Sequence, residues 1–212
     1  MALFISLEGG EGSGKTAVTS TLAARLQRAG ADVVHTFEPG GTEFGAAVRQ
    51  WLFQTDQPLS AWSETFLFLA DRTQHVAEVI RPALARGAVV LCDRYADSTL
   101  AYQGYGRGLD LRLLRDLNQH ATGGLMPNLT LFLDVPVQEG LRRARSEGPD
   151  RIGGEVLAFH MRVSEGYKRL TLAEPDRIKT LDAAVSLSEV IAAAWAAIAP
   201  RLQRAGFALT SD

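Results

Sequence analysis

The chain has 212 residues, of which 46% are hydrophobic and 22% charged, a mixture typical of globular proteins. Its 22 basic and 24 acidic side chains nearly cancel, so no overall positive field predicts a nucleic-acid or membrane-surface partner. Cys92 is the only cysteine, which excludes a disulfide framework and a cysteine-based zinc site.

No basic segment precedes a short apolar run at the N-terminus, and no apolar stretch approaches the 18 or so residues of a membrane span. We therefore expect a soluble, cytoplasmic protein. No linker or repeat divides the sequence, which predicts one domain over residues 1–212.

Short β-forming runs alternate with longer segments that have apolar residues three and four positions apart. This alternation predicts parallel strands joined by helical crossovers, that is, a three-layer α/β/α fold. The predicted strands cover residues 3–7, 32–36, 88–92, 129–135 and 177–181. The predicted helices cover residues 16–29, 43–53, 60–86, 111–120, 136–145, 155–172 and 187–204, with a further helix after residue 95.

The segment 146–154, SEGPDRIGG, contains three glycines and a proline and fits neither pattern. A polar, glycine-rich stretch between two predicted helices indicates a loop, and we expect it to act as a mobile lid.

A glycine-rich motif follows the first predicted strand and precedes a predicted helix. It matches G-x-x-x-x-G-K-[ST] in full, through Gly9, Gly10, Glu11, Gly12, Ser13, Gly14, Lys15 and Thr16. In such a loop, backbone amides surround the nucleotide phosphates, the lysine reaches the β and γ oxygens, and the hydroxyl can bind Mg²⁺. The alternative, a glycine-rich turn without a ligand, does not explain why a predicted strand precedes the motif and a predicted helix follows it. The motif predicts that ATP or GTP binds here. Because the sequence lacks the base-reading motif N-K-x-D, we do not expect a GTPase.

Asp93 ends the third predicted strand, where an acid can support the magnesium shell together with Thr16. The alternative is a solvated strand end or a helix cap.

Four segments together resemble bacterial thymidylate kinases. They are EGGEGSGKT at 8–16, EPGGT at 38–42, DRY at 93–95 followed by ADSTLAYQGYGRG, and DRI at 150–152. The resemblance implies a P-loop nucleoside monophosphate kinase fold with sheet order 2-3-1-4-5. It also implies Mg²⁺-dependent transfer of the ATP γ-phosphoryl group to dTMP, giving dTDP for dTTP synthesis, by a cytoplasmic homodimer. The alternatives are a kinase for another pyrimidine nucleotide and a catalytically silent nucleotide-binding regulator.

Glu64, Phe68 and Arg72 recur every fourth residue and so share one helix face. The resemblance implies that Phe68 stacks on thymine and that Arg72 contacts the O4 edge. From the residues alone, Phe68 could equally belong to the core.

The resemblance assigns further acceptor contacts. Arg94 would bind the acceptor phosphate, although a simple ion pair with its neighbour is the alternative. Thr99 and Gln103 would read the polar edge of the base, and Tyr102 would crowd the position of a ribose 2′-hydroxyl. Glu11 would contact the 3′-hydroxyl region, provided that a partner neutralises its charge.

Lys15, Arg94 and Arg151 are the predicted catalytic residues. Some thymidylate kinases carry an arginine inside the phosphate loop, but Gly12 occupies that position here. Arg142, Arg143, Arg145 and Arg151 are the candidates for the cation that stabilises the transferred group. We expect Arg151, which lies in the lid and matches the family's Asp-Arg, to take this role, with a solvated loop arginine as the alternative. Phe37 stands where many relatives have an arginine, and the sequence assigns no role to Arg107.

Overall fold

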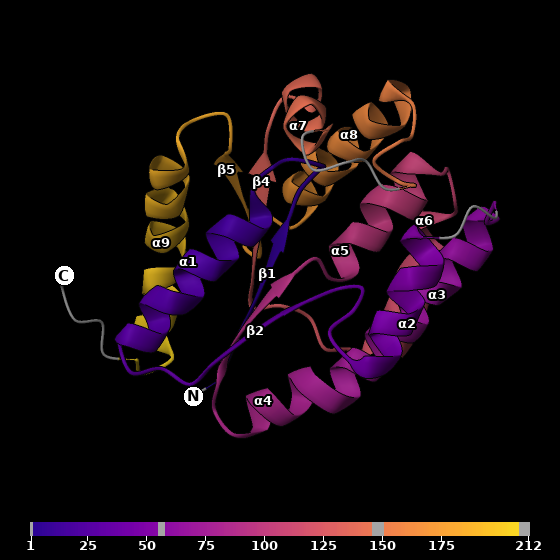
Figure 1. Ribbon diagram of the computed structural model, residues 1–212. Helices are drawn as coiled ribbons and strands as arrows, with labels where there is room; N and C mark the ends of the chain where they lie inside the picture. The colour runs from indigo at the N-terminus through magenta and orange to yellow at the C-terminus, as the bar shows by residue number, and fades with distance from the viewer. Residues whose placement is uncertain (1, 55–57, 146–150, 208–212) are drawn as a thin grey trace.

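The computed structural model describes residues 2–54, 58–145 and 151–207. Its centre is a five-stranded parallel sheet in the order β2-β3-β1-β4-β5 (Figure 1). The strands are β1 (Leu3–Glu8), β2 (Val33–Phe37), β3 (Val89–Asp93), β4 (Leu129–Asp134) and β5 (Ile178–Asp182). The fold class and the strand order expected from the sequence are both confirmed, and each strand lies within one or two residues of its predicted range.

Helices cover both faces of this sheet (Figure 1). Along β1, Leu3, Ile5 and Leu7 pack against α1 (Lys15–Arg28) and α9 (Leu187–Arg204). Phe4 points to the opposite face, where it packs against the helix pair η1 (Val76–Ile80) and α4 (Arg81–Ala85). This alternation buries the strand on both sides, as a parallel sheet between helices requires.

The remaining helices build the walls around the carboxyl ends of the strands. They are α2 (Glu43–Phe53), α3 (Ala61–His75), α5 (Ala96–Thr99), η2 (Leu100–Gly106), α6 (Leu111–Thr122), α7 (Val137–Arg145) and α8 (Leu157–Ala173). Several begin at a side-chain cap: Thr42, Ser60 and Asp110 each accept a hydrogen bond from a backbone N–H three residues later. Such caps fix where α2, α3 and α6 start, and thereby where their inward faces lie.

The predicted helix 60–86 is continuous but not uniform. A π-helical turn, η1, separates α3 from α4, and Pro82 lies in the first turn of α4, where its missing N–H is tolerated. The predicted lid is only partly visible: residues 146–150 lie outside the described residues, and residues 151–154 form turns.

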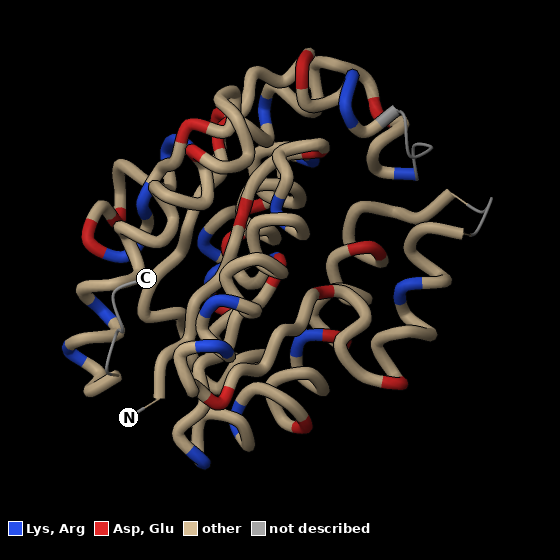
Figure 2. Tube along the Cα trace, turned by 60° about the vertical axis from the view of Figure 1, so that its left-hand side comes forward, with Lys and Arg blue, Asp and Glu red and all other residues tan. Residues whose placement is uncertain are grey.

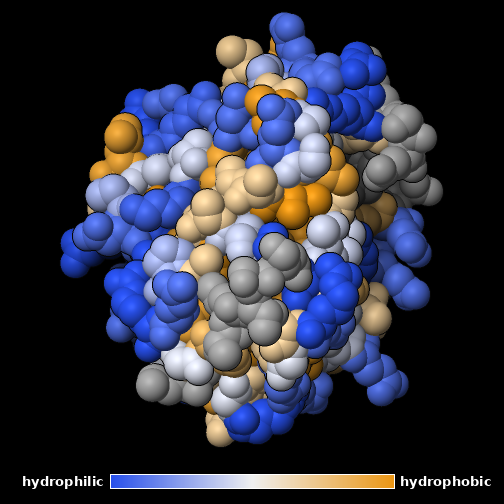
Figure 3. Space-filling model, turned by 90° about the vertical axis from the view of Figure 1, so that its left-hand side faces the viewer, coloured by the Kyte–Doolittle hydropathy of each residue, from blue (hydrophilic) through white to orange (hydrophobic). Residues whose placement is uncertain are grey.

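Charges of both signs are interspersed along the chain (Figure 2). Viewed from the side that carries α1 and α9, hydrophobic residues gather near the middle and hydrophilic residues surround them (Figure 3). In the described part of the chain, no helix has the length and apolar character needed to cross a membrane.

Candidate active site

The phosphate-binding loop connects β1 to α1 through glycines with left-handed backbone angles. Gly14 is the N-cap of α1 with φ of 85°, and Gly12 has φ of 62°, a region that side chains disfavour. A Cβ at Gly12 would also overlap the carbonyl oxygen of Gly140 in α7. The loop therefore needs glycine at position 12 for two reasons, its backbone angle and the closeness of α7.

Lys15 folds back over this loop. Its Nζ donates to the carbonyl oxygens of Gly9 (3.2 Å) and Gly10 (2.9 Å) and to Ser13 Oγ (3.2 Å). Burial, followed by the nearby positive charge of Arg94, lowers the Lys15 pKa to about 8. The ammonium group thus lies at the loop, where the phosphates of a bound nucleotide would meet it.

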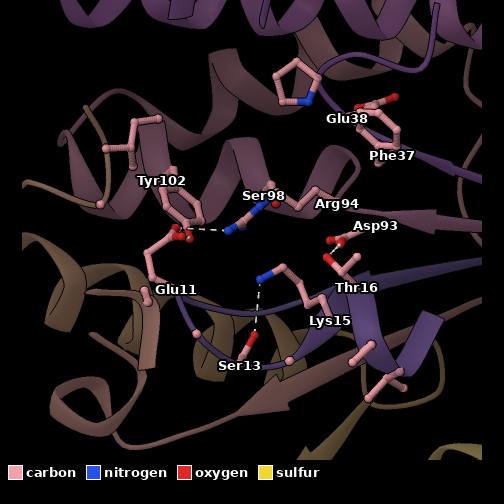
Figure 4. Close-up of a pocket in the computed structure, with 18 of the residues that line it drawn as sticks. Glu11, Ser13, Lys15, Thr16, Phe37, Glu38, Asp93, Arg94, Ser98 and Tyr102 are labelled. Atoms are coloured by element: carbon pink, nitrogen blue, oxygen red, sulfur yellow. Dashed lines mark hydrogen bonds and ion pairs between the residues drawn. The ribbon is translucent and has the colours of Figure 1, made fainter. Parts of the chain in front are cut away.

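Thr16 and Asp93 lie together at the carboxyl end of the sheet. Thr16 Oγ1 donates to Asp93 Oδ2 at 2.9 Å, although 77 residues separate them (Figure 4). A hydroxyl and a carboxylate are the hard oxygen donors that Mg²⁺ prefers. The donor set fits the ion beside the phosphate loop.

Arg94 follows Asp93 and neutralises the acid of the phosphate loop. Its backbone is left-handed, with φ of 69°, and its guanidinium donates to Gly9 O and to Glu11 Oε1, both at 3.0 Å. Tyr102 donates to the same Glu11 oxygen at 2.8 Å. Burial opposes ionisation of Glu11, but Arg94 and Lys15 hold its pKa below the ordinary value. Figure 4 shows Lys15 and Arg94 approaching the same space, with Glu11 beside them.

Glu8, the last residue of β1, supports the turn that carries Arg94. Its fully buried carboxylate accepts hydrogen bonds from Tyr95 N–H (2.8 Å), Ser98 Oγ (2.6 Å) and Tyr167 Oη (2.9 Å). Burial, with the charge of Asp97 second, raises the Glu8 pKa to about 7. The role of Glu8 was not predicted from the sequence, although an acid at the end of an apolar strand is a signal that could have identified it.

Arg72 lies on the wall of the cleft with its guanidinium almost fully bonded. It donates to Glu38 (2.8 Å), Thr99 Oγ1 (2.7 Å), Asn118 Oδ1 (2.7 Å) and the carbonyl oxygen of Tyr95 (3.0 Å). These bonds use four of its five N–H groups and leave one for a ligand. Its side chain is only 1% exposed, so the position of Arg72 is set by the protein before any substrate binds.

Glu38, the partner of Arg72, also bonds His75 Nδ1 at 2.9 Å, and His75 Nε2 bonds Thr36 Oγ1 at 2.6 Å. Cys92 lies close enough to complete a group of three possible metal ligands. However, burial raises the pKa of the Cys92 thiol well above its ordinary value, and both histidine nitrogens are already bonded. This group is a buried hydrogen-bond network that fixes Arg72.

Phe68 and Gln103 also line the cleft. The Phe68 ring is half-buried, with the ring of Phe53 6.4 Å away, edge to face. Gln103 Nε2 donates to Glu64 Oε1 at 2.9 Å. The structure thus brings the predicted base-contacting residues onto one wall, although they come from α3, α5 and η2.

Arg151 lies on the acceptor side of the cleft. Its Nη2 donates to Glu64 Oε2 at 2.8 Å and its Nε to the carbonyl oxygen of Leu52 at 2.9 Å. Arg107, to which the sequence assigned no role, donates to the same Glu64 oxygen at 3.0 Å. In this conformation the Arg151 guanidinium is held by α2 and α3, and it is not among the groups at the phosphate loop.

The opposite end of the cleft was not predicted from the sequence. Arg143 Nη1 donates to the carbonyl oxygen of Ala183 at 2.9 Å, and Val185 and Leu187 form an apolar wall beside them. An apolar slot with a few polar groups suits a nucleobase. The loop after β5, which carries this wall, has no distinctive motif that could have identified it.

One cleft of about 1050 Å³ runs from Val185 and Leu187, past the phosphate loop, to Phe68 and Gln103. A typical small-molecule site occupies about 300–1,000 Å³. The cleft therefore has room for more than one small ligand.

Comparison with known proteins agrees with this geometry. A family model described as Thymidylate kinase matches residues 7–194. The chain belongs to the thymidylate kinase family. A thymidylate kinase of Synechococcus sp. (strain JA-2-3B'a(2-13)) is 52% identical over 200 residues, covering 94% of this chain and 96% of the relative. The thymidylate kinase of Deinococcus radiodurans is 50% identical over 200 residues, covering 94% and 97%.

Among solved structures, the thymidylate kinase of Ehrlichia chaffeensis matches with a TM-score of 0.72 and 35% identity, covering 85% of this chain and 92% of that one. Membership in the thymidylate kinase family makes this chain an enzyme that phosphorylates dTMP to dTDP. The resemblance drawn from the four sequence segments is confirmed.

Proposed function

We propose that the chain transfers the γ-phosphoryl group of Mg-ATP to dTMP, with ATP at the phosphate loop and dTMP at the α3 wall. This proposal rests on one observation: Lys15 and Arg94 line the same cleft and approach the same space. Lys15 comes from the phosphate loop and Arg94 from the turn after β3. Phosphoryl transfer needs little covalent chemistry from the protein, so positioning and charge stabilisation account for catalysis.

At the donor end, we assign ATP to the loop of residues 9–16 and its adenine to the slot beside Arg143. Lys15 places its ammonium group against the β and γ oxygens. Thr16 and Asp93 would hold Mg²⁺. When bound there, Mg²⁺ would neutralise charge on the ATP phosphates.

At the acceptor end, we assign the dTMP phosphate to Arg94. Its charge is permanent: burial opposes it, but Tyr102 and Glu11 more than offset this and raise the Arg94 pKa well above its ordinary value. Glu11 then faces the 3′-hydroxyl region, and Tyr102 lies where a 2′-hydroxyl would clash. The hydrogen bond between Tyr102 and Glu11 supports this arrangement, because it fixes the ring in the cleft.

The base would lie between Phe68, which stacks on it, and the polar groups of Arg72, Thr99 and Gln103. Arg72 has one N–H left after its four protein bonds, which suits a single contact to the O4 carbonyl. Thr99 accepts from Arg72 at 2.7 Å, so its contribution is to orient that guanidinium.

Arg151 remains our candidate for the cation that stabilises the transferred group. To act there it would have to leave Glu64 and the Leu52 carbonyl and move toward the phosphate loop. Closure of a loop over bound substrates is a common way to complete an active site. Arg143 lines the donor end of the cleft and is the alternative cation.

We also propose a cytoplasmic homodimer built from one domain. Phe44 and Trp51 on α2 and Phe66 on α3 are 48%, 61% and 54% exposed, and α2 packs against α3. Large apolar side chains gathered on one exposed face mark interaction surfaces. A second copy of the chain would cover them, and analytical ultracentrifugation of the Trp51→Glu variant tests this.

The experiment that tests the proposed activity is a rate panel with Mg-ATP as donor and dTMP, dUMP, UMP, dCMP and dGMP as acceptors. We expect dTMP to give the highest kcat/KM. A higher kcat/KM for another nucleotide would show that this nucleotide, and not dTMP, is the preferred substrate. Tight ATP binding without turnover of any acceptor would instead favour a regulatory protein.

A further inference from the structure

Glu64 is a buried carboxylate at the acceptor end of the cleft. It lies on α3 and its side chain is 1% exposed. Its Oε1 accepts from Gln103 Nε2 at 2.9 Å and from Arg107 Nε at 3.2 Å. Its Oε2 accepts from Arg107 Nη2 at 3.0 Å and from Arg151 Nη2 at 2.8 Å. Four donors therefore surround one carboxylate.

These donors keep Glu64 ionised. Burial favours the neutral acid, but the hydrogen bonds from Arg107, Gln103 and Arg151 outweigh burial and lower the Glu64 pKa. An ionised carboxylate can only accept hydrogen bonds. The neighbouring amide of Gln103 must then turn its NH₂ group toward Glu64.

The orientation of that amide determines what Gln103 offers to a ligand. A planar amide carries its oxygen and nitrogen at opposite ends, so with Nε2 held by Glu64 the free end is the acceptor Oε1. Gln103 and Arg72 both line the cleft. Together they present one acceptor and one donor. Thymine and uracil carry the matching N3–H donor and O4 acceptor, whereas cytosine carries an N3 acceptor and an amino donor.

We infer that Glu64 is a positioning residue that sets the base specificity of the acceptor site, because it holds the Gln103 amide with its oxygen toward the base and so selects a pyrimidine with an N3–H group. The inference rests on the proposed function. It also gives Arg107 a role: Arg107 holds the carboxylate in place and in its charged form.

The substitution Glu64→Gln tests this with a change of one atom. Two guanidinium donors, Arg107 Nη2 at 3.0 Å and Arg151 Nη2 at 2.8 Å, face the Oε2 position, against one weaker donor, Arg107 Nε at 3.2 Å, at Oε1. The new amide should therefore place its oxygen at the Oε2 position and its NH₂ group toward Gln103. Gln103 would then have to flip and offer Nε2 to the base. We expect the ratio of kcat/KM for dTMP to that for dCMP to fall at least ~10-fold, because a polar site rejects a ligand that leaves its groups unpaired.

Two comparisons separate this effect from a general loss of structure. The ratio of dTMP to dUMP should stay as in the wild type, since both bases carry N3–H and O4, and the KM for ATP should not change. Glu165→Gln, in an exposed ion pair with Arg169 on α8, is the matched control and should change none of these ratios. A dTMP to dCMP ratio that stays at the wild-type value in Glu64→Gln overturns the inference.

Gln103→Leu decides the matter if Glu64→Gln does not fold. Leucine cannot accept from N3–H, so the dTMP to dCMP ratio should fall, and unchanged discrimination would overturn the inference. In the double variant, Glu64→Gln should add nothing to the effect of Gln103→Leu, since residues acting through one another are non-additive. Failure of the wild-type protein to phosphorylate dTMP would instead contradict the proposed function.

Discussion

The two ends of the cleft are built by different means. The donor end comes mainly from eight consecutive residues, 9–16, whose backbone and one lysine form the phosphate site. The acceptor end comes from side chains on α2, α3, the β3–α5 turn, η2 and α6, joined by hydrogen bonds that span tens of residues. A local motif therefore identifies the donor end, whereas only the tertiary structure shows how the acceptor end is assembled.

Substitution of Lys15 should have the largest effect of any change discussed here. In Lys15→Ala we expect kcat to fall by roughly 10³-fold, because no other described cation lies on the loop to stabilise the charge that develops on the phosphates. Binding of dTMP, measured by calorimetry, should change little. The control is Lys168→Ala, which replaces an exposed lysine of α8 that lies near Asp134. Near-normal turnover in Lys15→Ala would show that the donor end does not depend on this charge.

Arg151→Ala tests which end of the cleft this residue serves. We expect kcat to fall by at least roughly 10²-fold with little change in the KM for dTMP, because a contact formed mainly in the transition state affects kcat. Steady-state kinetics with Arg169→Ala as control measure this. A normal kcat with a raised KM for dTMP would assign Arg151 to the acceptor end alone, and Arg143 would be tested next.

Tyr102 should control the choice of sugar. In Tyr102→Ala we expect discrimination between dTMP and its ribose counterpart to fall by about 10-fold, because a contact that clashes only with the 2′-hydroxyl is removed. Tyr102→Phe keeps the ring and should keep most of the discrimination, although it loses the bond to Glu11. Competition assays with the two nucleotides measure the ratio, and equal discrimination in all three proteins would exclude Tyr102.

The smallest expected effect is on stability, and it concerns Glu8, which lies between the two ends of the cleft. Burial, then Asp97, raises the Glu8 pKa from 4.5 to about 7 in the folded protein. Between these two pH values the folded state keeps a proton on Glu8 that the unfolded state releases. The contribution of Glu8 to the free energy of unfolding is therefore fully present below pH 4.5 and is lost as the pH rises through 7. In Glu8→Gln, the free energy of unfolding, measured with urea at pH 5 and at pH 8, should fall less between the two pH values than in the wild type. Part of the decline should remain, because the pKa of Asp71 is raised in the same direction, to about 6. A decline as steep as in the wild type would contradict the role of Glu8.

The sequence predicted the sheet well because the signals of its strands are local, and the motif of the phosphate loop is local too. Strand periodicity placed β1 to β5, and the adjacent residues of the loop fixed Lys15 and Thr16. The helix at 60–86 was predicted as one segment, and α3, η1 and α4 do follow one another without a break over residues 61–85; apolar spacing alone does not mark the π-helical turn.

The acceptor end could be predicted only as a set of residues. Phe68, Arg72, Tyr102 and Gln103 do line the cleft as expected, but their hydrogen-bond partners were not foreseen. Arg151 pairs with Glu64 across 87 residues of sequence, and no spacing rule relates two such positions. Contacts of this kind arise from packing of α2, α3 and η2, which periodicity does not encode.

The close approach of Gly12 to Gly140 limits how this enzyme can evolve. An arginine inside the phosphate loop would have to fill position 12, where any side chain meets the backbone of α7 and a disfavoured φ. A single mutation there would lose the packing before it gained the charge. A side chain at position 12 therefore requires a displacement of α7.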